Sequence, residues 1–236
     1  MSGNEPDQHG VLSYRVGYRE SEIPRKYSGW LHFWCMSGTS IAIIAGCLVL
    51  LKKTTPLEWL TVPLTYLYAN FAEYIGHRGP MHHRRKGLST VYRHTTIHHR
   101  FYTDQYFGFE GPRDFHALLL PPSLLVFFFG LFAVPVGVVL YSLVTPNTGL
   151  LFVATAVFYF LTYEWLHFCY HLRDEAFLLR FPFVRKLRQL HLNHHNPRLM
   201  NQYNFNITIP IFDWLFGTIY KKERAKKGVV SKTKRA

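Results

Sequence analysis

Ten histidines of this chain fall into four short groups, and this pattern constrains the fold more than any other feature. The groups are His77 and His82; His94, His98 and His99; His167 and His171; and His191, His194 and His195. Each group lies at the end of a long apolar stretch or just beyond one, so the apolar segments place imidazoles in one polar layer. We expect this layer to lie at a membrane surface and to hold more than one metal ion.

Four apolar stretches have the length, or nearly the length, of about 20 residues that crosses a bilayer. They are Trp30 to Leu51, Leu57 to about Ile75, Ala117 to Val144, and Leu150 to about Tyr170. The second stretch carries Asn70 and Glu73, which should face protein rather than lipid. The third contains Pro121, Pro122 and Pro135, so we expect it to be kinked or partly re-entrant. The sequence predicts an all-α integral membrane protein with about four transmembrane helices in two hairpins and a cytosolic, histidine-rich cap.

The distribution of charge predicts the orientation. The chain has 27 Lys and Arg against 14 Asp and Glu, and 25 of the 27 cations lie in segments that four spans would place on one side. The positive-inside rule puts that side, with both termini, in the cytosol. Lys52 and Lys53 go against the rule, although they can snorkel at the far interface. Since no zinc-finger, RNP or basic-helix pattern is present, we assign the charge to an anionic membrane surface and expect no nucleic-acid partner.

We divide the chain into three parts: a cytosolic N-terminal segment 1–29, a membrane-embedded histidine-box domain 30–220, and a basic C-terminal tail 221–236. The N-terminus lacks the basic region and apolar core of a cleavable signal peptide, so the first span is expected to be an uncleaved anchor. The ending Lys232-Thr-Lys234-Arg-Ala is similar to a retrieval signal of the endoplasmic reticulum, although a random basic tail yields it easily. We therefore expect the endoplasmic reticulum in a eukaryote and the inner membrane in a bacterium.

The spacing within the groups favours metal chelation. Residues three or four apart share one face of an α-helix, so His94 with His98, and His167 with His171, are each expected to point at a common ion. Adjacent pairs such as His98 and His99 cannot share a face, but they can serve two neighbouring ions. Neutral imidazole suits iron, copper, nickel and zinc, so ligand type alone does not choose iron over zinc.

Four histidines lie outside this set of ten. We expect His9, His32 and His116 to be ordinary polar residues. His83 is an alternative to its neighbour His82, although the spacing of the first group favours His82. A proton relay would also use histidines, but it would scatter them along the spans instead of gathering them at one level.

The four groups resemble the histidine boxes of the fatty acid hydroxylase / sterol desaturase superfamily. The matching segments are His77-Arg-Gly-Pro-Met-His82, His94-Thr-Thr-Ile-His98-His99, His167-Phe-Cys-Tyr-His171 and His191-Leu-Asn-His194-His195. The order of the boxes agrees, and the resemblance extends over residues 57–220, including the segment Asp213-Trp-Leu-Phe-Gly-Thr218. It implies that all ten histidines are metal ligands, with no catalytic residue beyond them.

The resemblance implies a di-metal, O2-dependent membrane enzyme that hydroxylates or desaturates a fatty acyl or sterol-like substrate. Two iron ions are the expected metals, zinc fits the same ligands, and O2 is the co-substrate. An unactivated C–H bond offers no acidic proton and no leaving group, so a redox metal must do this chemistry. Because the sequence contains no cytochrome b5 module, flavin motif or GxGxxG, we expect a separate electron donor of cytochrome b5 or ferredoxin type with its reductase.

Two alternatives stay open. The first box, with Met81, His82 and His83, is similar to that of carotenoid hydroxylases, which makes a carotenoid-type hydroxylase one alternative. A non-catalytic membrane protein that binds or transports metal is the other. Such a transporter would space titratable residues through its spans, and these are largely absent.

Three carboxylates lie three or four residues from a histidine of the groups: Glu73, Glu164 and Asp174. They are candidates to orient imidazoles, and Glu73 and Glu164 can alternatively be buried acids that pack helices. The lipid substrate is expected to enter from the bilayer, because its methylenes are driven out of water. Aromatic residues within 66–74 and 158–170 are candidates to line that route, or else face lipid or the core.

Overall fold

The computed structural model describes residues 8–222, and all secondary structure in this part of the chain is helical, which confirms the predicted all-α class. The α-helices are α1 (Gln8–Ser21), α2 (Gly29–Val49), α3 (Pro56–Trp59), α4 (Thr61–Gly76), α5 (Ser89–Arg93), α6 (His99–Phe101), α7 (Phe115–Leu118), α8 (Pro122–Phe128), α9 (Val134–Leu143), α10 (Pro146–Tyr170), α11 (Pro182–His194) and α12 (Ile211–Leu215). Between them lie the π-helices η1 (His77–Met81), η2 (His94–His98) and η4 (Phe129–Ala133), and the 3-10 helices η3 (Pro112–Asp114) and η5 (Phe177–Arg180).

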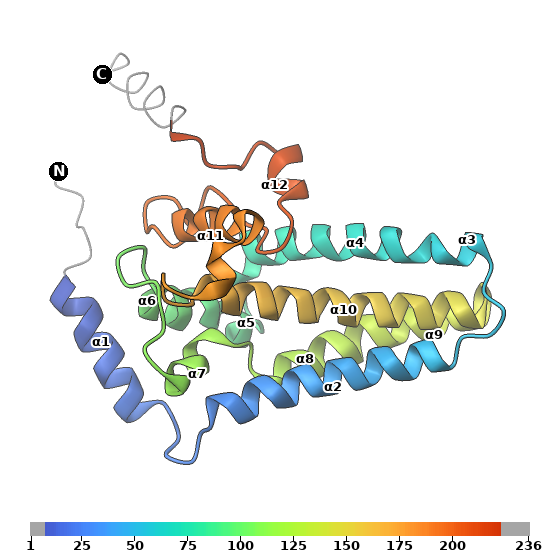
Figure 1. The fold of residues 1–236 in the computed structure, drawn as a ribbon, viewed down its shortest axis with the longest axis horizontal. Coiled ribbons are helices and arrows are strands. Elements are labelled where there is room, and N and C mark those ends of the chain that lie inside the picture. The colour runs from blue at the N-terminus through green and yellow to red at the C-terminus, as the bar shows by residue number, and fades with distance from the viewer. Residues whose placement is uncertain (1–7, 223–236) are drawn as a thin grey trace.

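The long helices form a bundle around α10. Helix α10 packs against α2, α4 and α9, and Figure 1 shows these helices running side by side with the short helices α5, α6, α7 and α11 gathered at one end. The outer helices expose large apolar side chains, such as Leu64 on α4 and Val138 and Leu143 on α9. In a bilayer these faces contact lipid, because every backbone group of a helix is already hydrogen-bonded within it.

Three helical stretches of the described residues are long and apolar enough to cross a membrane: Gly29–Val49, Pro112–Leu143 and Pro146–Tyr170. They correspond to three of the four predicted spans and make this a membrane protein. The remaining predicted span forms α3 and α4, and the 16 residues of α4 fall short of the about 20 that cross hydrocarbon. The count of four spans therefore stays a prediction.

The proline-rich run bends as the sequence predicts. Helix α7 ends at Leu118, the chain is extended at Leu119 and Pro121, and α8 begins at Pro122. Proline supplies no backbone N–H and fits the first turn of a helix, so the break falls where two prolines stand together. The extended segment carries its backbone toward the histidines, which a continuous helix would not do.

At the other end of the bundle, polar groups join the turns of the two hairpins. The Asn147 side chain pairs with the Lys52 backbone, accepting from its N–H at 3.0 Å and donating to its carbonyl at 2.8 Å. The Thr145 hydroxyl donates to Glu58 at 2.6 Å. The predicted uncharged link 145–149 is thus mostly the first turn of α10, with Thr145 as its N-cap.

Helices α9 and α10 approach each other through two glycines. A Cβ added at Gly149 would lie 2.5 Å from the carbonyl oxygen of Gly137 and 2.7 Å from the backbone nitrogen of Tyr141. Small residues permit such close backbone approach between membrane helices, where van der Waals packing is the main source of association.

We predict that Gly149→Ala destabilises the bundle by about 1–3 kcal/mol, because backbone atoms cannot yield to the added methyl group. Gly46→Ala in α2 is the matched control, since a Cβ there meets nothing within 4 Å. SDS titration of the purified protein measures both. Equal stability of the two variants would contradict the close α9–α10 contact.

Candidate metal centre

The ten predicted ligand histidines meet at the end of the bundle that carries the short helices. The first cluster contains His77, His82, His94, His99 and His194, and the second contains His98, His167, His171, His191 and His195. None of the ten is more than 7% exposed. Within each cluster the candidate ligand atoms all lie within 4.8 Å of one another. The structure thus presents two buried, all-imidazole donor sets side by side.

The π-helix η2 decides which histidines of the second group share a cluster. The backbone N–H of His99 bonds to the carbonyl of His94, the five-residue spacing of a π-helix. This turn brings the Nε2 atoms of His94 and His99 to 3.0 Å from each other. The expectation that His94 and His98 serve a common ion is therefore wrong: it assumed an α-helix, and the two residues lie in different clusters.

The adjacent pairs divide between the clusters, as expected for neighbouring ions. His98 and His99 lie in different clusters, and so do His194 and His195. Stacking of His99 on His195, with ring centroids 4.3 Å apart, joins the two sets. Each cluster therefore takes four histidines from one half of the chain and its fifth from the opposite half.

Backbone carbonyls orient five of the imidazoles through Nδ1. His98 bonds to Ala117 at 3.0 Å, His171 to Phe107 at 2.7 Å, His194 to Tyr203 at 2.9 Å, His195 to Tyr102 at 2.5 Å, and His77 to Phe205. A carbonyl oxygen can only accept, so each of these Nδ1 atoms carries the proton. Each Nε2 then presents a lone pair to the interior of its cluster.

The lone pairs face one another at distances that fit metal coordination. The Nε2 atoms of His98 and His195 are 3.1 Å apart, although both rings already donate through Nδ1 and neither Nε2 has a proton to share. Two ligands at right angles around a metal, with bonds of about 2.1 Å, lie about 3.0 Å apart. The donor sets therefore fit one cation each, which would replace repulsion between lone pairs with coordination.

Burial keeps these imidazoles neutral. Desolvation lowers the pKa of His98 to about 4 and that of His82 to about 2, and it lowers the pKa of His99 and His191 well below the ordinary value. A metal binds the unprotonated ring, so the site is prepared for cations at neutral pH.

The segment 204–208 is held on two sides and supports the first cluster. The buried carboxylate of Asp213 accepts from the backbone N–H of Phe205 at 3.0 Å and of Asn206 at 2.7 Å. Glu73 accepts from the backbone of Ile207 and from Thr208, its hydroxyl at 2.7 Å. Because the carbonyl of Phe205 orients His77, both acids position that ring through the backbone.

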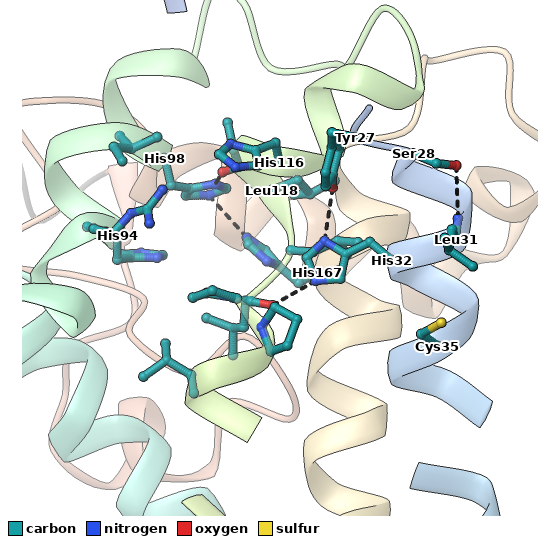
Figure 2. Close-up of a pocket in the computed structure, with 18 of the residues that line it drawn as sticks. Tyr27, Ser28, Leu31, His32, Cys35, His94, His98, His116, Leu118 and His167 are labelled. Atoms are coloured by element: carbon teal, nitrogen blue, oxygen red, sulfur yellow. Dashed lines mark hydrogen bonds between the residues drawn. The ribbon is translucent and has the colours of Figure 1, made fainter. Parts of the chain in front are cut away.

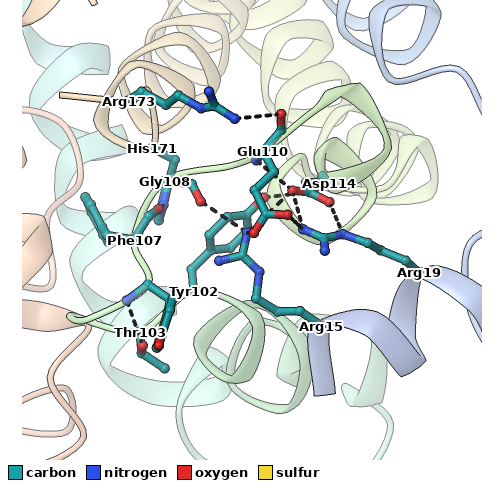
Figure 3. Close-up of polar contacts among 11 residues, drawn as sticks. Arg15, Arg19, Tyr102, Thr103, Phe107, Gly108, Glu110, Asp114, His171 and Arg173 are labelled. Carbon is teal, nitrogen blue, oxygen red and sulfur yellow. Dashed lines mark hydrogen bonds and ion pairs between the residues drawn. The ribbon is translucent and has the colours of Figure 1, made fainter. Parts of the chain in front are cut away.

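An arginine pair on α1 supports the second cluster. Arg19 binds both carboxylate oxygens of Asp114, at 2.7 and 2.9 Å, and the buried Arg15 bonds to the carbonyl of Gly108 at 3.2 Å and to Glu110 at 3.1 Å. Figure 3 shows the side chains of Arg15 and Arg19 against the segment that carries Tyr102 and Phe107. The carbonyls of that loop orient His195 and His171, so α1 stabilises the second cluster from outside.

The three predicted carboxylates have other contacts than imidazoles. Glu73 binds the 207–208 backbone, Glu164 accepts from the N–H of Leu120 at 3.3 Å, and Asp174 pairs with Arg188 at 2.6 Å. Backbone carbonyls, and not these carboxylates, hydrogen-bond directly to the histidine rings. The sequence does not predict these carbonyls, because no side-chain type marks them. The basic residues of α1 are the one sequence feature that could have indicated the arginine pair.

His32, His83 and His116 belong to neither cluster. His83 is exposed, whereas its neighbour His82 is buried. His32 and His116 line a cavity of about 460 Å³ that also reaches His94, His98 and His167. Figure 2 shows His94 and His98 on one side of the cavity and Leu31 and Cys35 on the other. This cavity is lined by α2, α5, α7 and α8, not by the aromatic residues of 66–74 and 158–170.

Comparison with known proteins decides the family. The fatty acid hydroxylase family matches residues 62–218, which hold all ten clustered histidines. The chain belongs to the fatty acid hydroxylase family. The protein is therefore an oxidoreductase, and family membership favours an enzyme over a non-catalytic protein that binds or transports metal.

A solved structure has a similar fold to this protein. In that structure, of full-length Scs7p, only the hydroxylase domain is visible. It is 21% identical, with a TM-score of 0.55 over 80% of this chain and 67% of the other. A search of curated sequences found no significant match. At this identity the likeness concerns the fold alone.

We predict that the metal-free protein loses stability below pH 6.5. The folded pKa of His98, about 4, lies below the unfolded value of about 6.5, so between these values the unfolded chain binds more protons and acid favours unfolding. At pH 5 this one ring accounts for about 2 kcal/mol. Unfolding midpoints of chelator-treated protein from pH 8 to pH 5 measure the loss. A constant midpoint would contradict burial of neutral imidazoles.

We predict that His82→Ala removes bound metal and that His83→Ala does not. The two residues are adjacent and chemically identical, but only His82 reaches a cluster. Loss of one ligand from the first set should lower the metal content by roughly half. Elemental analysis of the purified variants measures this, and equal metal content would show that His82 is not a ligand.

Proposed function

We propose that this protein is a di-iron, O2-dependent hydroxylase or desaturase that acts on a carbon of a membrane lipid, with all ten clustered histidines as metal ligands. One observation carries the proposal: two sets of five buried imidazoles stand at the end of a membrane bundle, next to an apolar cavity. An aqueous hydrolase needs no such apolar approach, and a structural zinc site is closed by four ligands.

Bound iron would supply the reduction of O2 to an oxidant able to attack an unactivated C–H bond. The chain itself does the remaining work. His98 and His167 belong to the second cluster and also line the cavity, so a substrate carbon there lies beside a ligand set. The walls formed by Leu118, Leu119 and Leu124 exclude water from this carbon, which limits unproductive reduction of O2.

The electrons would come from a separate donor of cytochrome b5 or ferredoxin type with its reductase. Shortly after the buried His82, the segment Arg84, Arg85 and Lys86 is exposed and cationic. Such a surface favours encounter with an acidic protein, and its position beside the first cluster shortens the path of the electron.

The same proposal gives the protein its place in the cell. The clustered histidines and the cationic loops lie at the cytosolic end of the bundle, with both termini on that side, in the endoplasmic reticulum of a eukaryote or the inner membrane of a bacterium. The proposal keeps the division into a cytosolic N-terminal segment 1–29, a membrane-embedded domain 30–220 and a basic C-terminal tail 221–236. Residues 1–7 and 223–236, with the basic tail and the similarity to a retrieval signal, lie outside the described residues.

We predict that the iron-loaded protein in nanodiscs, supplied with a reductase and donor, incorporates one atom of ¹⁸O from ¹⁸O2 into an acyl chain or removes two hydrogens from it. His98→Ala should lower turnover at least about a hundredfold, because His98 belongs to a ligand set and lines the cavity. His83→Ala is the control and should keep turnover. Mass spectrometry of fatty acyl, sterol and carotenoid substrates measures the product.

A preparation that binds no metal would overturn the whole proposal. Iron-loaded protein that oxidises carotenoids but no acyl or sterol lipid would support the carotenoid-type alternative. Turnover that survives in the His98→Ala variant would show that the chemistry lies outside the second cluster.

A further inference from the structure

The cavity beside the second cluster has two ends of different chemistry. At one end lie the ligand rings His98 and His167, and at the other the chain entering α2 contributes Lys26 and Tyr27. In Figure 2, Tyr27 and Leu31 lie across the cavity from His98. At about 460 Å³ the cavity is in the lower part of the range for small-ligand sites, about 300–1,000 Å³. This size suits one acyl chain better than two.

Between these ends the walls are apolar. The segment from Leu118 to Leu124, with Ile97 opposite it on η2, supplies aliphatic carbon, and His32 has both ring nitrogens engaged, with the Tyr27 hydroxyl at 2.9 Å and the Leu120 carbonyl at 3.2 Å. A sugar or a nucleotide would leave its polar groups unpaired here. Methylene groups would be removed from water without that penalty.

Two cations at the rim have no acidic partner. Lys26 and Arg93 both line the cavity, and no Asp or Glu of the described residues lines it with them. The ion pairs of the described residues leave both out: Glu110 and Asp114 are engaged by the arginines of α1. Arg93 hydrogen-bonds to the Tyr18 side chain, but neither cation has a carboxylate of the described residues at ion-pair distance. A ligand that brings an anion to this rim would therefore meet two positive charges that are not engaged in an ion pair.

Cations at a membrane surface often contact phospholipid head groups from outside. Lys26 and Arg93 differ because they border the same cavity as the ligand histidines. An anion bound between them would have its chain directed into the apolar part of the cavity. The two cations and the apolar cavity thus favour a single ligand that has both an anionic head and an apolar chain.

We propose that this cavity binds a single-chain amphiphile with an anionic head group, the head between Lys26 and Arg93 and the chain along Leu118 to Leu124 toward His98 and His167. This inference rests on the proposed function and names its substrate class: an acyl chain with an anionic head, not a sterol or a carotenoid. A carboxylate and a phosphate head share this chemistry.

The test measures binding to zinc-loaded protein in phosphatidylcholine nanodiscs, so that no turnover is required. The probes are radiolabelled palmitate, lysophosphatidate and the uncharged methyl palmitate. We expect at least one anionic probe to bind at least about tenfold more tightly than methyl palmitate, and a Lys26→Gln/Arg93→Gln double variant to remove that preference. Whichever anionic probe binds identifies a carboxylate or a phosphate head.

Three further variants keep the result interpretable. Arg185→Gln changes an exposed cation of α11 outside the cavity and should bind as the unaltered protein does. Arg93→Lys keeps the charge and should retain most of the preference. Cys35→Trp fills the cavity opposite the histidines and should weaken binding of all three probes. Unchanged metal content in each variant shows that the clusters remain folded.

Equal binding of palmitate, lysophosphatidate and methyl palmitate, or an anionic preference that survives in the double variant, would overturn the inference. Either result leaves the proposed function standing if iron-loaded protein still oxidises a lipid in the ¹⁸O2 experiment. Absence of bound metal would instead remove the proposed function.

Discussion

The structure depends on one constraint: ten neutral imidazoles must point their lone pairs inward at two places from which water is excluded. Without cations these lone pairs repel, as the 3.1 Å between the Nε2 atoms of His98 and His195 illustrates. Hydrogen bonds from Nδ1 to backbone carbonyls prevent five of the rings from turning away. The clusters are therefore preorganised for metal, and this arrangement lowers the stability of the metal-free protein. Functional sites commonly have such a cost in stability.

The supports of the two clusters come from different segments of the chain. Helix α1 stabilises the loop that orients His171 and His195, while Glu73 and Asp213 fix the segment that orients His77. The bundle holds these supports together, because α10 contacts α2, α4 and α9. Gly149 packs near the start of the same helix, α10, that carries His167 near its end.

Sequence reasoning reached the parts of the molecule that side-chain chemistry determines. Ten ligand candidates and three long spans follow from residue identity and apolar runs, and the proline break follows from the missing N–H. Sequence reasoning did not predict the features that depend on the conformation of the backbone. A π-helical turn differs from an α-helical turn by one residue, so the partner of His94 was assigned to the wrong cluster. Carbonyl acceptors have no signature, and the cavity is formed by segments distant in sequence.

The division of ligands between the two halves of the chain has a consequence for biosynthesis. Four histidines of the first cluster lie before residue 100, but the fifth, His194, follows the last long membrane helix. The second cluster likewise includes His98 from the earlier half of the chain. A ribosome-bound chain that has inserted α2 to α9 thus holds neither complete set. Under the proposed function, neither set is complete until His194 and His195 have been synthesised, and a chain cut short before α11 would lack histidines of both sets.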